Sequence, residues 1–413
     1  MIVRGGTVVT TRGVERADIA VDGGVIVEVE HDLDEQGEEI DAAGLHVFPG
    51  GIDSHVHFNE PGRTEWEDIG HGTAALAAGG YTAFIDMPLN NLPVTTTVAA
   101  FDLKVEAMGR SARVDYGLWG GLVPGNLDQL APLVERGVMG FKAFMCPSGI
   151  DEFAMCDDRT LREGMKRIAD LDSILLVHAE DPSLLREPQG PTVRDFLASR
   201  PPEAEIAAID TAIAIAQETG CRLHVVHVST TRGAELIAAA PNVSGETCPH
   251  YLLYSDDDLE RLGGLGKCAP PFRAERMGLM PVVVSDHSPS TLELKQGEDL
   301  RNVWGGISGC QSTRQLLLRM DGMELSTVAA VTATNVADRF RIPRKGDIAP
   351  GFDADLWLVD LNHQDVMRRD DLLYRNQFSV HEGQKIRGRT VRTLVRGRDA
   401  TAVLGLGFRP ATC

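Results

Sequence analysis

The chain has 413 residues, of which 43% are hydrophobic and 24% are charged, so it can bury one large core and a smaller second one. Its formal net charge of -20 argues against a nucleic-acid-binding surface and against a polybasic patch for a membrane surface. We therefore expect a globular protein that binds neither nucleic acid nor membrane.

The N-terminus and the cysteines indicate the cellular compartment. Residues 1–6 lack the basic and apolar regions of a signal peptide, and no later apolar run approaches the length of a membrane span. The seven cysteines are odd in number and include no C-x-x-C pair, which is typical of reduced thiols. These features predict a cytoplasmic protein.

Short strand patterns at both ends of the chain predict a small β domain. They cover residues 2–3, 7–9, 18–21, 25–29, 354–359 and 390–397. Residues 22–24, Asp-Gly-Gly, are a hairpin signal between two of them. Neither end is large enough to form a core alone, so we expect residues 1–47 and 345–413 to combine into one split β-sandwich domain.

Residues 48–344 alternate apolar strand patterns with helical patterns. One strand pattern leads into His55 within residues 48–59, and the others lie at residues 81–86, 114–119, 138–144, 174–178, 223–228, 243–247 and 282–285. The helical patterns include residues 67–78, 98–108, 160–171, 203–219 and 232–239. Eight such strands favour an α/β fold, a parallel TIM (β/α)8 barrel, over an open doubly wound sheet. No G-x-G-x-x-G or P-loop motif follows a strand, which disfavours dinucleotide binding.

The first barrel strand leads into two histidines, His55 and His57. Their i, i+2 spacing in a strand places both imidazoles on one face, as metal ligands require. The alternative is a surface strand whose histidines face water, but it leaves the apolar approach and the preceding Asp53 unexplained. We therefore interpret the pair as metal ligands.

Four further polar side chains lie in or at the ends of other predicted strands. Lys142 lies in the fourth strand, and His178, His227 and Asp286 end the fifth, sixth and eighth. Since the carboxyl ends of barrel strands meet at one mouth, these residues and the two histidines of the first strand predict a binuclear metal site. Any one of the histidines alone would more often be a hydrogen-bonded structural residue, so the prediction depends on the joint pattern.

A lysine among metal ligands needs a chemical explanation, because an ammonium repels cations and has no lone pair to donate. A neutral Lys142 amine that adds carbon dioxide becomes a carbamate, whose two oxygens can bridge two metal ions. The alternative is a lysine that extends from the strand end to water. The apolar setting of Lys142 within residues 140–145 favours the carbamate.

Six stretches of the chain carry a resemblance to a known family. They cover residues 55–67, 86–90, 141–150, 246–251, 267–271 and 285–289. With the order His-x-His, Lys, His, His, Asp inside a split β domain, the chain resembles the cyclic amidohydrolases, which include dihydroorotases, hydantoinases, dihydropyrimidinases and allantoinases. The resemblance spans nearly the whole chain and is strongest to the allantoinase branch.

The resemblance implies a metal-dependent hydrolysis of a cyclic amide, allantoin, to allantoate. His55 and His57 would bind one divalent ion and His178 and His227 a second, with carboxylated Lys142 bridging them. Asp286 would complete the first site, take a proton from a hydroxide that bridges the ions, and pass it to the departing ring nitrogen. Zinc is the first choice of metal, with iron, cobalt or manganese as alternatives, and the family also implies a homotetramer.

Residues near the ligands indicate the substrate within this family. Dihydroorotases have an arginine for a substrate carboxylate two residues after the second histidine, and this chain has Asn59 there, which favours a neutral ring. Hydantoinases and dihydropyrimidinases have a tyrosine five residues after the lysine, and this chain has Pro147 followed by Ser148, which favours the polar ureido arm of allantoin. Asn90 and the loop at Gly305 are further candidates for the pocket rim. Asn59, Ser148 and the glycine could equally be turn and loop formers.

Two alternative functions stay open, and one segment of the chain departs from the pattern of its relatives. The alternatives are a hydantoinase or dihydropyrimidinase, and a non-catalytic scaffold on the same fold, although relatives of the second kind lack the metal ligands. The departure lies at residues 272–281, where relatives have a full helix and this chain does not, so we expect barrel closure near the eighth strand to be affected. An intact mass above that of the printed sequence would indicate residues missing there.

Overall fold

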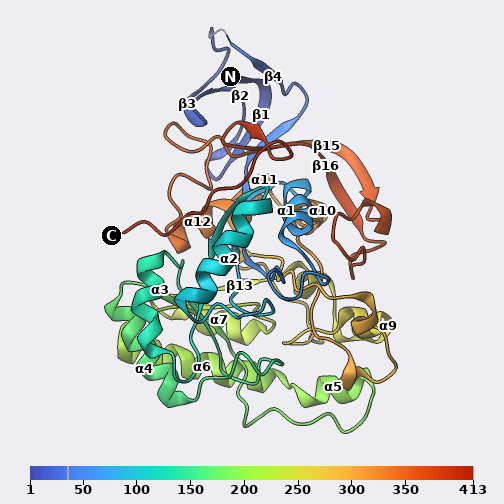
Figure 1. Ribbon diagram of the computed structural model, residues 1–413. Coiled ribbons are helices and arrows are strands. Elements are labelled where there is room, and N and C mark those ends of the chain that lie inside the picture. The colour runs from blue at the N-terminus through green and yellow to red at the C-terminus, as the bar shows by residue number, and fades with distance from the viewer. Residues whose placement is uncertain (35–36, 413) are drawn as a thin grey trace.

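Strands from both ends of the chain form one mixed sheet in the computed structural model, which describes residues 1–34 and 37–412. The order along the sheet is β17-β16-β15-β5-β1-β2-β3, and β4 pairs with β1. These strands are β1 (Ile2–Thr10), β2 (Gly13–Asp22), β3 (Val25–Glu30), β4 (Glu39–Asp41), β5 (His46–Pro49), β15 (Leu356–Val366), β16 (Lys385–Val395) and β17 (Arg398–Asp399). Figure 1 shows the N-terminal strands at the top, with β15 and β16 below them to the right. Because β5 pairs antiparallel with β15, each end of the chain completes the other, as the sequence predicts.

The terminal sheet encloses a small apolar core. Val8, Ile19, Val47 and Leu356 are almost fully buried in it. The sheet curls around this core, since β3 forms an isolated bridge to Asp353 just before β15. The apolar faces of the two chain ends therefore cover each other.

Strand β1 differs from the prediction of two short strands. It runs unbroken because a register shift against β2, between Val3 and Gly6, absorbs Gly5, whose φ of 71° is readily available to glycine. The two halves of the strand then pair in turn with β4 and β5.

The barrel that the sequence predicts is present. Its strands are β6 (Gly51–Val56), β7 (Tyr81–Asp86), β8 (Asp115–Leu118) with its continuation β9 (Gly120–Gly121), β10 (Phe141–Phe144), β11 (Ile174–His178), β12 (Arg222–Val225), β13 (Val243–Thr247) and β14 (Val282–Val283). β6 to β8 pair in order, and so do β9 to β14, all in parallel. The carboxyl ends of these strands therefore face one side of the barrel.

Helices connect the barrel strands (Figure 1). They are α1 (Ile69–Ala78), α2 (Val98–Ser111), α3 (Leu130–Arg136), α4 (Asp158–Asp170), α5 (Val193–Ser199), α6 (Pro202–Thr219), α7 (Thr231–Ala239), α8 (Pro249–Leu253), α9 (Asp256–Leu262), α10 (Thr313–Arg319), α11 (Leu325–Ala329) and α12 (Asn335–Phe340). Several begin at a side-chain cap: Asp68 accepts a backbone N–H of α1, Thr97 one of α2 and Thr230 one of α7. α1, α2, α4, α6 and α7 confirm the five helical patterns, with ends that differ by three residues or fewer.

The barrel closes through a short contact beside β14. That strand has two residues, and within residues 272–281, all of which the structure describes, there is no helix. α8 and α9 instead occupy the connection from β13. A parallel bridge between Val56 and His287, with the His57 N–H donating to His287 O at 2.8 Å, joins the end of the ring to β6. The barrel is therefore closed, but by fewer strand contacts than a longer eighth strand would make. The missing helix at residues 272–281 predicts this reduction.

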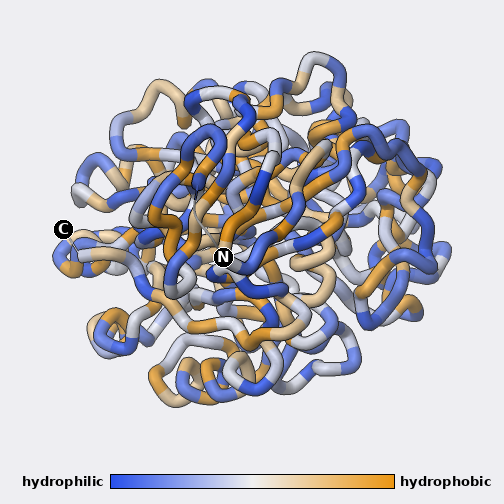
Figure 2. Tube along the Cα trace, turned by 90° about the horizontal axis from the view of Figure 1, so that it is seen from above, coloured by the Kyte–Doolittle hydropathy of each residue, from blue (hydrophilic) through white to orange (hydrophobic). Residues whose placement is uncertain are grey.

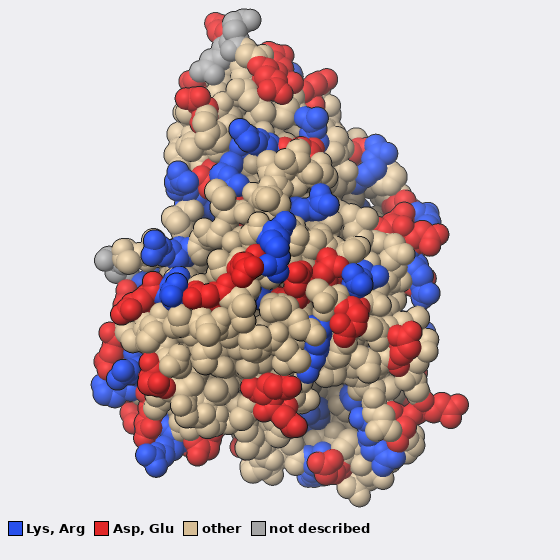
Figure 3. Space-filling view, in the orientation of Figure 1, with Lys and Arg blue, Asp and Glu red and all other residues tan. Residues whose placement is uncertain are grey.

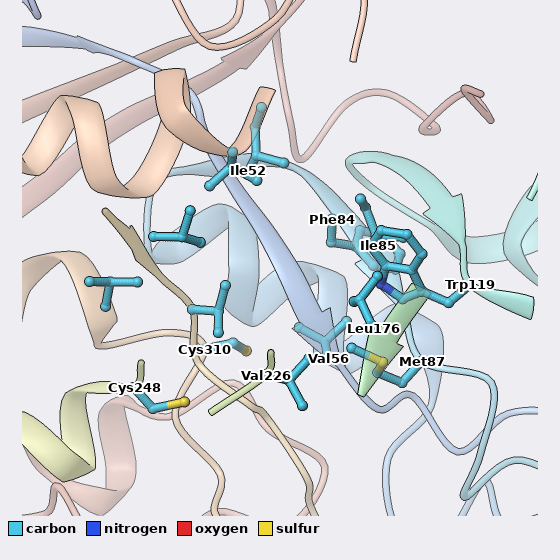
Figure 4. Close-up of a cluster of buried hydrophobic side chains, with 14 of the residues drawn as sticks. Ile52, Val56, Phe84, Ile85, Met87, Trp119, Leu176, Val226, Cys248 and Cys310 are labelled. Carbon is cyan, nitrogen blue, oxygen red and sulfur yellow. The ribbon is translucent and has the colours of Figure 1, made fainter. Parts of the chain in front are cut away.

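A large apolar core fills the barrel. Figure 4 shows Ile52 and Val56 of β6 clustered with Phe84, Leu176 and Val226, which come from distant parts of the sequence. Figure 2 shows hydrophobic and hydrophilic residues mixed along the chain trace. This packing fixes the strand ends that carry the polar residues described below.

The structure also shows the state of the cysteines, the distribution of charged side chains on one face and the length of the helices. The six described cysteines are free and buried, whereas Cys413 lies outside the described residues. Figure 3 shows acidic and basic side chains interspersed over the face in view. None of the described helices has the length and apolar character needed to cross a bilayer.

Candidate functional site

One cavity lies at the carboxyl ends of the barrel strands. Its volume is about 790 Å³, within the range of small-molecule sites. The six predicted ligands all line it: His55, His57, Lys142, His178, His227 and Asp286. Residues more than 230 positions apart in the chain are thus brought to one place.

His55, His57 and Asp286 form one part of this cluster. Asp286 Oδ1 lies 3.2 Å from His55 Nε2 and 3.5 Å from His57 Nε2. The donor atoms of all three lie within 4.8 Å of one another, which is close enough to share one cation. Burial raises the pKa of Asp286, but His55 and His57 outweigh this effect and hold the pKa well below its usual range. Asp286 is therefore a carboxylate, able to bind a cation or accept a proton.

His178 and His227 form a second part. His178 Nδ1 lies 3.1 Å from His227 Nε2, and the His227 ring centroid lies 5.5 Å from that of His55. Burial, and then the neighbouring His178 and Lys142, lower the pKa of His227 well below its usual value. A neutral imidazole offers a lone pair to a metal ion. The two histidines are thus chemically suited to a second cation.

Lys142 lies in β10 and is 1% exposed. Its Nζ has no hydrogen-bond partner among the described residues. Burial lowers the pKa of Lys142 to about 7, although Glu246 and Asp286 act in the opposite direction. Because an unpaired ammonium is costly to bury, this nitrogen fits a neutral amine or a modified one. The lysine does not extend to water.

Unusual backbone conformations present two of these side chains to the cavity. His227 has a φ of 39° and Asp286 a φ of 44°, a region that non-glycine residues seldom adopt. β12 consequently ends at Val225, before the predicted end at residue 228, and His227 follows in the loop. Such conformations persist where the surrounding fold holds them, and they are concentrated at functional sites.

Glu246 orients His55 from behind the cavity. Its Oε1 accepts a hydrogen bond from His55 Nδ1 at 2.5 Å, and its Oε2 lies 3.0 Å from His224 Nε2. Burial raises the pKa of Glu246, but His55 and His224 lower it to about 2 overall. With its Nδ1 proton engaged, His55 keeps the Nε2 lone pair for the cavity.

Glu180, which is held by Arg200, orients His178 in a similar way. His178 Nε2 donates to Glu180 Oε2 at 2.7 Å, and Arg200 donates to both oxygens of that carboxylate, at 3.1 and 2.5 Å. Burial raises the pKa of Glu180, but Arg200 and His178 lower it to about 2. His178 Nδ1 is therefore left as the lone-pair atom that faces His227.

Sequence reasoning missed these supporting carboxylates. Glu246 lies within the predicted strand at residues 243–247, and Glu180 follows His178 by two residues. A charged residue facing a barrel interior is a usable signal for either one. Arg200 lies beyond the end of α5, with no pattern that links it to Glu180.

Three of the four predicted substrate contacts line the cavity. Asn90 places its Nδ2 3.4 Å from His57 Nδ1, and Gly305 is exposed at the cavity wall. Ser148 also lines the cavity, but its hydroxyl is within hydrogen-bond distance of two carbonyls of its own loop, at 3.1 and 2.6 Å. Ser148 therefore serves the loop conformation in this structure.

Asn59 is the residue that the structure does not bring to the cavity. It is fully buried, and neither polar atom of its amide has a hydrogen-bond partner among the described residues. Its backbone N–H donates to Glu67 O at 3.1 Å and its carbonyl accepts from the Arg63 N–H at 2.9 Å. Asn59 is thus held by backbone hydrogen bonds within residues 59–67 and does not line the cavity.

Comparisons with known proteins agree with this geometry. The sequence model of the amidohydrolase family matches residues 46–397. An allantoinase of Rubrobacter xylanophilus is 50% identical, over 96% of this chain and 93% of the relative, and an allantoinase of Escherichia coli is 39% identical, over 96% and 94%. The solved L-hydantoinase (dihydropyrimidinase) of Arthrobacter aurescens superposes with a TM-score of 0.93 at 31% identity, over 99% of this chain and 97% of that chain.

Proposed function

Since the chain belongs to the amidohydrolase family, we propose that it hydrolyses the cyclic amide of allantoin and releases allantoate. The family and its hydantoinase neighbours imply a metal-dependent enzyme that acts on cyclic amides. Relatives named allantoinase support the choice of ring. The observation that carries the proposal is the convergence of four imidazoles, a buried lysine and Asp286 on one cavity.

The residues at the cavity fit a pair of divalent cations. The imidazoles offer lone pairs, Asp286 is a carboxylate, and the buried Nζ of Lys142 and Nδ1 of His227 have no protein partner among the described residues. We assign His55, His57 and Asp286 to one ion and His178 and His227 to the other, with Lys142 between them. Two bound ions would supply a water of lowered pKa and polarise the ring carbonyl. Zinc suits this donor set, as do iron, cobalt and manganese.

Lys142 joins the set as a carbamate in this proposal. Its neutral Nζ would form an N–C bond with carbon dioxide and release one proton, which turns the amine into an anionic two-oxygen ligand. The absence of a hydrogen-bond partner for Nζ among the described residues and the depression of its pKa to about 7 support this step. Without it, the nitrogen would be a poor neighbour for two cations.

Residues of the chain would transfer the proton and bind the substrate. Asp286 would accept a proton from the attacking water and deliver it to the departing ring nitrogen, acting first as base and then as acid. Glu246 and Glu180 keep His55 and His178 in the tautomers that direct lone pairs at the cavity. Asn90 and Gly305 would hold the substrate at the wall.

The substitution Gly305→Val is expected to weaken the binding of allantoin, which carries a ureido arm, more than the binding of unsubstituted hydantoin. A Cβ at Gly305 meets nothing within 4 Å, so the substitution adds bulk to the cavity without a clash. The KM for allantoin should rise about tenfold, and that for unsubstituted hydantoin less than about threefold. Gly278→Val is the matched control, because Gly278 also has open space around it but does not line the cavity. Equal changes for both substrates would mean that the added bulk at residue 305 meets the ring rather than the arm.

A hydantoinase or dihydropyrimidinase activity is the second candidate, because the solved neighbour bears that name. Allantoin, hydantoin and dihydrouracil should be compared on one preparation loaded with zinc or manganese in bicarbonate. We expect kcat/KM to be highest for allantoin. A higher value for either of the other rings would replace the proposed substrate.

We also propose the molecular setting of this activity. Residues 1–47 and 345–413 would form the small domain and residues 48–344 the catalytic one, supported by the separate apolar core of the terminal sheet. The resemblance to cyclic amidohydrolases supports a homotetramer, and the free, buried thiols of the six described cysteines support a cytoplasmic location. Light scattering on the purified protein tests the tetramer, and a monomer or dimer mass would exclude it.

A further inference from the structure

A buried lysine outside the proposed metal centre holds one wall of the cavity. Lys295, the last residue of the 3-10 helix η3 (Leu292–Lys295), is 3% exposed. Its Nζ donates to Trp304 O and Gly306 O at 2.8 Å each, and to Lys267 O at 3.1 Å. All three acceptors are main-chain carbonyls of cavity-lining residues.

These contacts require the protonated lysine. Burial lowers the pKa of Lys295 to about 7. An ammonium has three N–H donors for the three carbonyls, whereas a neutral amine has two, so all three contacts are made only by the protonated form. The carbonyls therefore hold a cation at this point of the wall.

Several hydrogen bonds hold the wall segment at residues 304–306 in place. The Gly306 N–H donates to Lys267 O at 2.9 Å, and the Trp304 N–H donates to Leu294 O at 2.8 Å. Lys267 Nζ donates hydrogen bonds to two further carbonyls of the same loop, Leu300 O and Val303 O, at 2.6 Å each. The loop is thus fixed by donors from two lysines.

One N–H of this segment remains available to a ligand. Gly305 is exposed at the cavity wall, and its N–H makes no hydrogen bond within the described part of the chain. The carbonyl of the same peptide, Trp304 O, is the one that accepts from Lys295. A hydrogen bond to a peptide carbonyl polarises that peptide and strengthens its N–H as a donor.

We propose that Lys295 is a positioning residue, which holds and polarises the Trp304–Gly305 peptide so that the Gly305 N–H binds a ring oxygen of the cyclic amide substrate. The inference rests on the proposed function and extends it, because it assigns substrate affinity to a side chain that does not line the cavity. In this proposal the oxygen is that of the ring carbonyl that is not attacked, so the contact would be made equally before and during reaction.

Lys295→Met tests this assignment, because it removes all three donors and keeps an apolar chain of similar length. The KM for allantoin and for hydantoin should rise in parallel, about tenfold, while kcat stays within about twofold, as expected for a contact of equal strength in ground and transition states. Lys295→Arg keeps the charge and the donors and should raise KM less than about threefold. Metal content and melting temperature of each variant separate this effect from damage to the metal centre or the fold.

A KM within about twofold of wild type in Lys295→Met would overturn the inference, and so would a loss of kcat or of metal at unchanged KM. If wild type opens hydantoin or dihydrouracil but not allantoin, the proposed substrate fails and the same KM comparison proceeds on the accepted ring. If no ring is opened, hydrogen exchange decides the positioning role. Faster exchange in Lys295→Met confined to residues 300–307 supports the role, and unchanged exchange there rejects it.

Discussion

Lys142→Ala is expected to abolish turnover, with kcat for allantoin falling about a thousandfold or more. In the proposed centre Lys142 would hold both ions, so its loss should also lower the metal content below two ions per chain. The lysine is buried with no hydrogen-bond partner for Nζ among the described residues, so its removal breaks no hydrogen bond of the fold. Steady-state kinetics and elemental analysis on the same sample measure both effects.

Carbon-13 NMR on protein prepared in labelled bicarbonate provides the matching test of the carbamate. Wild type should show one carbamate carbon signal, and Lys142→Ala should lack it. Lys166→Ala is the control, because Lys166 is exposed on α4, where it pairs with Asp170. Full turnover of Lys142→Ala, or the same signal in both proteins, would remove the carbamate from the account.

Asp286→Asn is the second change with a very large expected effect. The amide is nearly isosteric but cannot accept the proton of the attacking water, so kcat should fall about a thousandfold or more. Because the side chain keeps its shape, the melting temperature should change little. Asp365→Asn is the control, since Asp365 is a surface carboxylate of β15 paired with Arg368. Turnover of Asp286→Asn within about tenfold of wild type would mean that another group carries the proton.

Much of the fold was accessible from the sequence, for a physical reason. Most barrel strands are buried on both faces and are largely apolar, so they stand out between the helical segments of the sequence. The candidate ligands were accessible for the same reason, because parallel strands bring their carboxyl ends to one mouth. His178 and Asp286 could thus be placed together without knowing a single contact.

Other features depend on pairings that no local pattern encodes. Glu246 meets His55 from 191 positions away, and Lys295 binds carbonyls whose residues carry no special side chain. The patterns at residues 2–3 and 7–9 predict two strands, whereas β1 runs through Gly5 with a register shift against β2. Asn59 is a candidate contact through the resemblance to dihydroorotases, which have an arginine at that position, but it does not line the cavity.

The most direct test of the central claim is a metal titration of the stripped enzyme. Zinc or manganese is added in bicarbonate buffer while allantoin hydrolysis is followed. The account predicts that activity rises until two ions are bound per chain and then levels off. A preparation that binds no ions at this cavity, or that binds two and leaves allantoin intact, would contradict it.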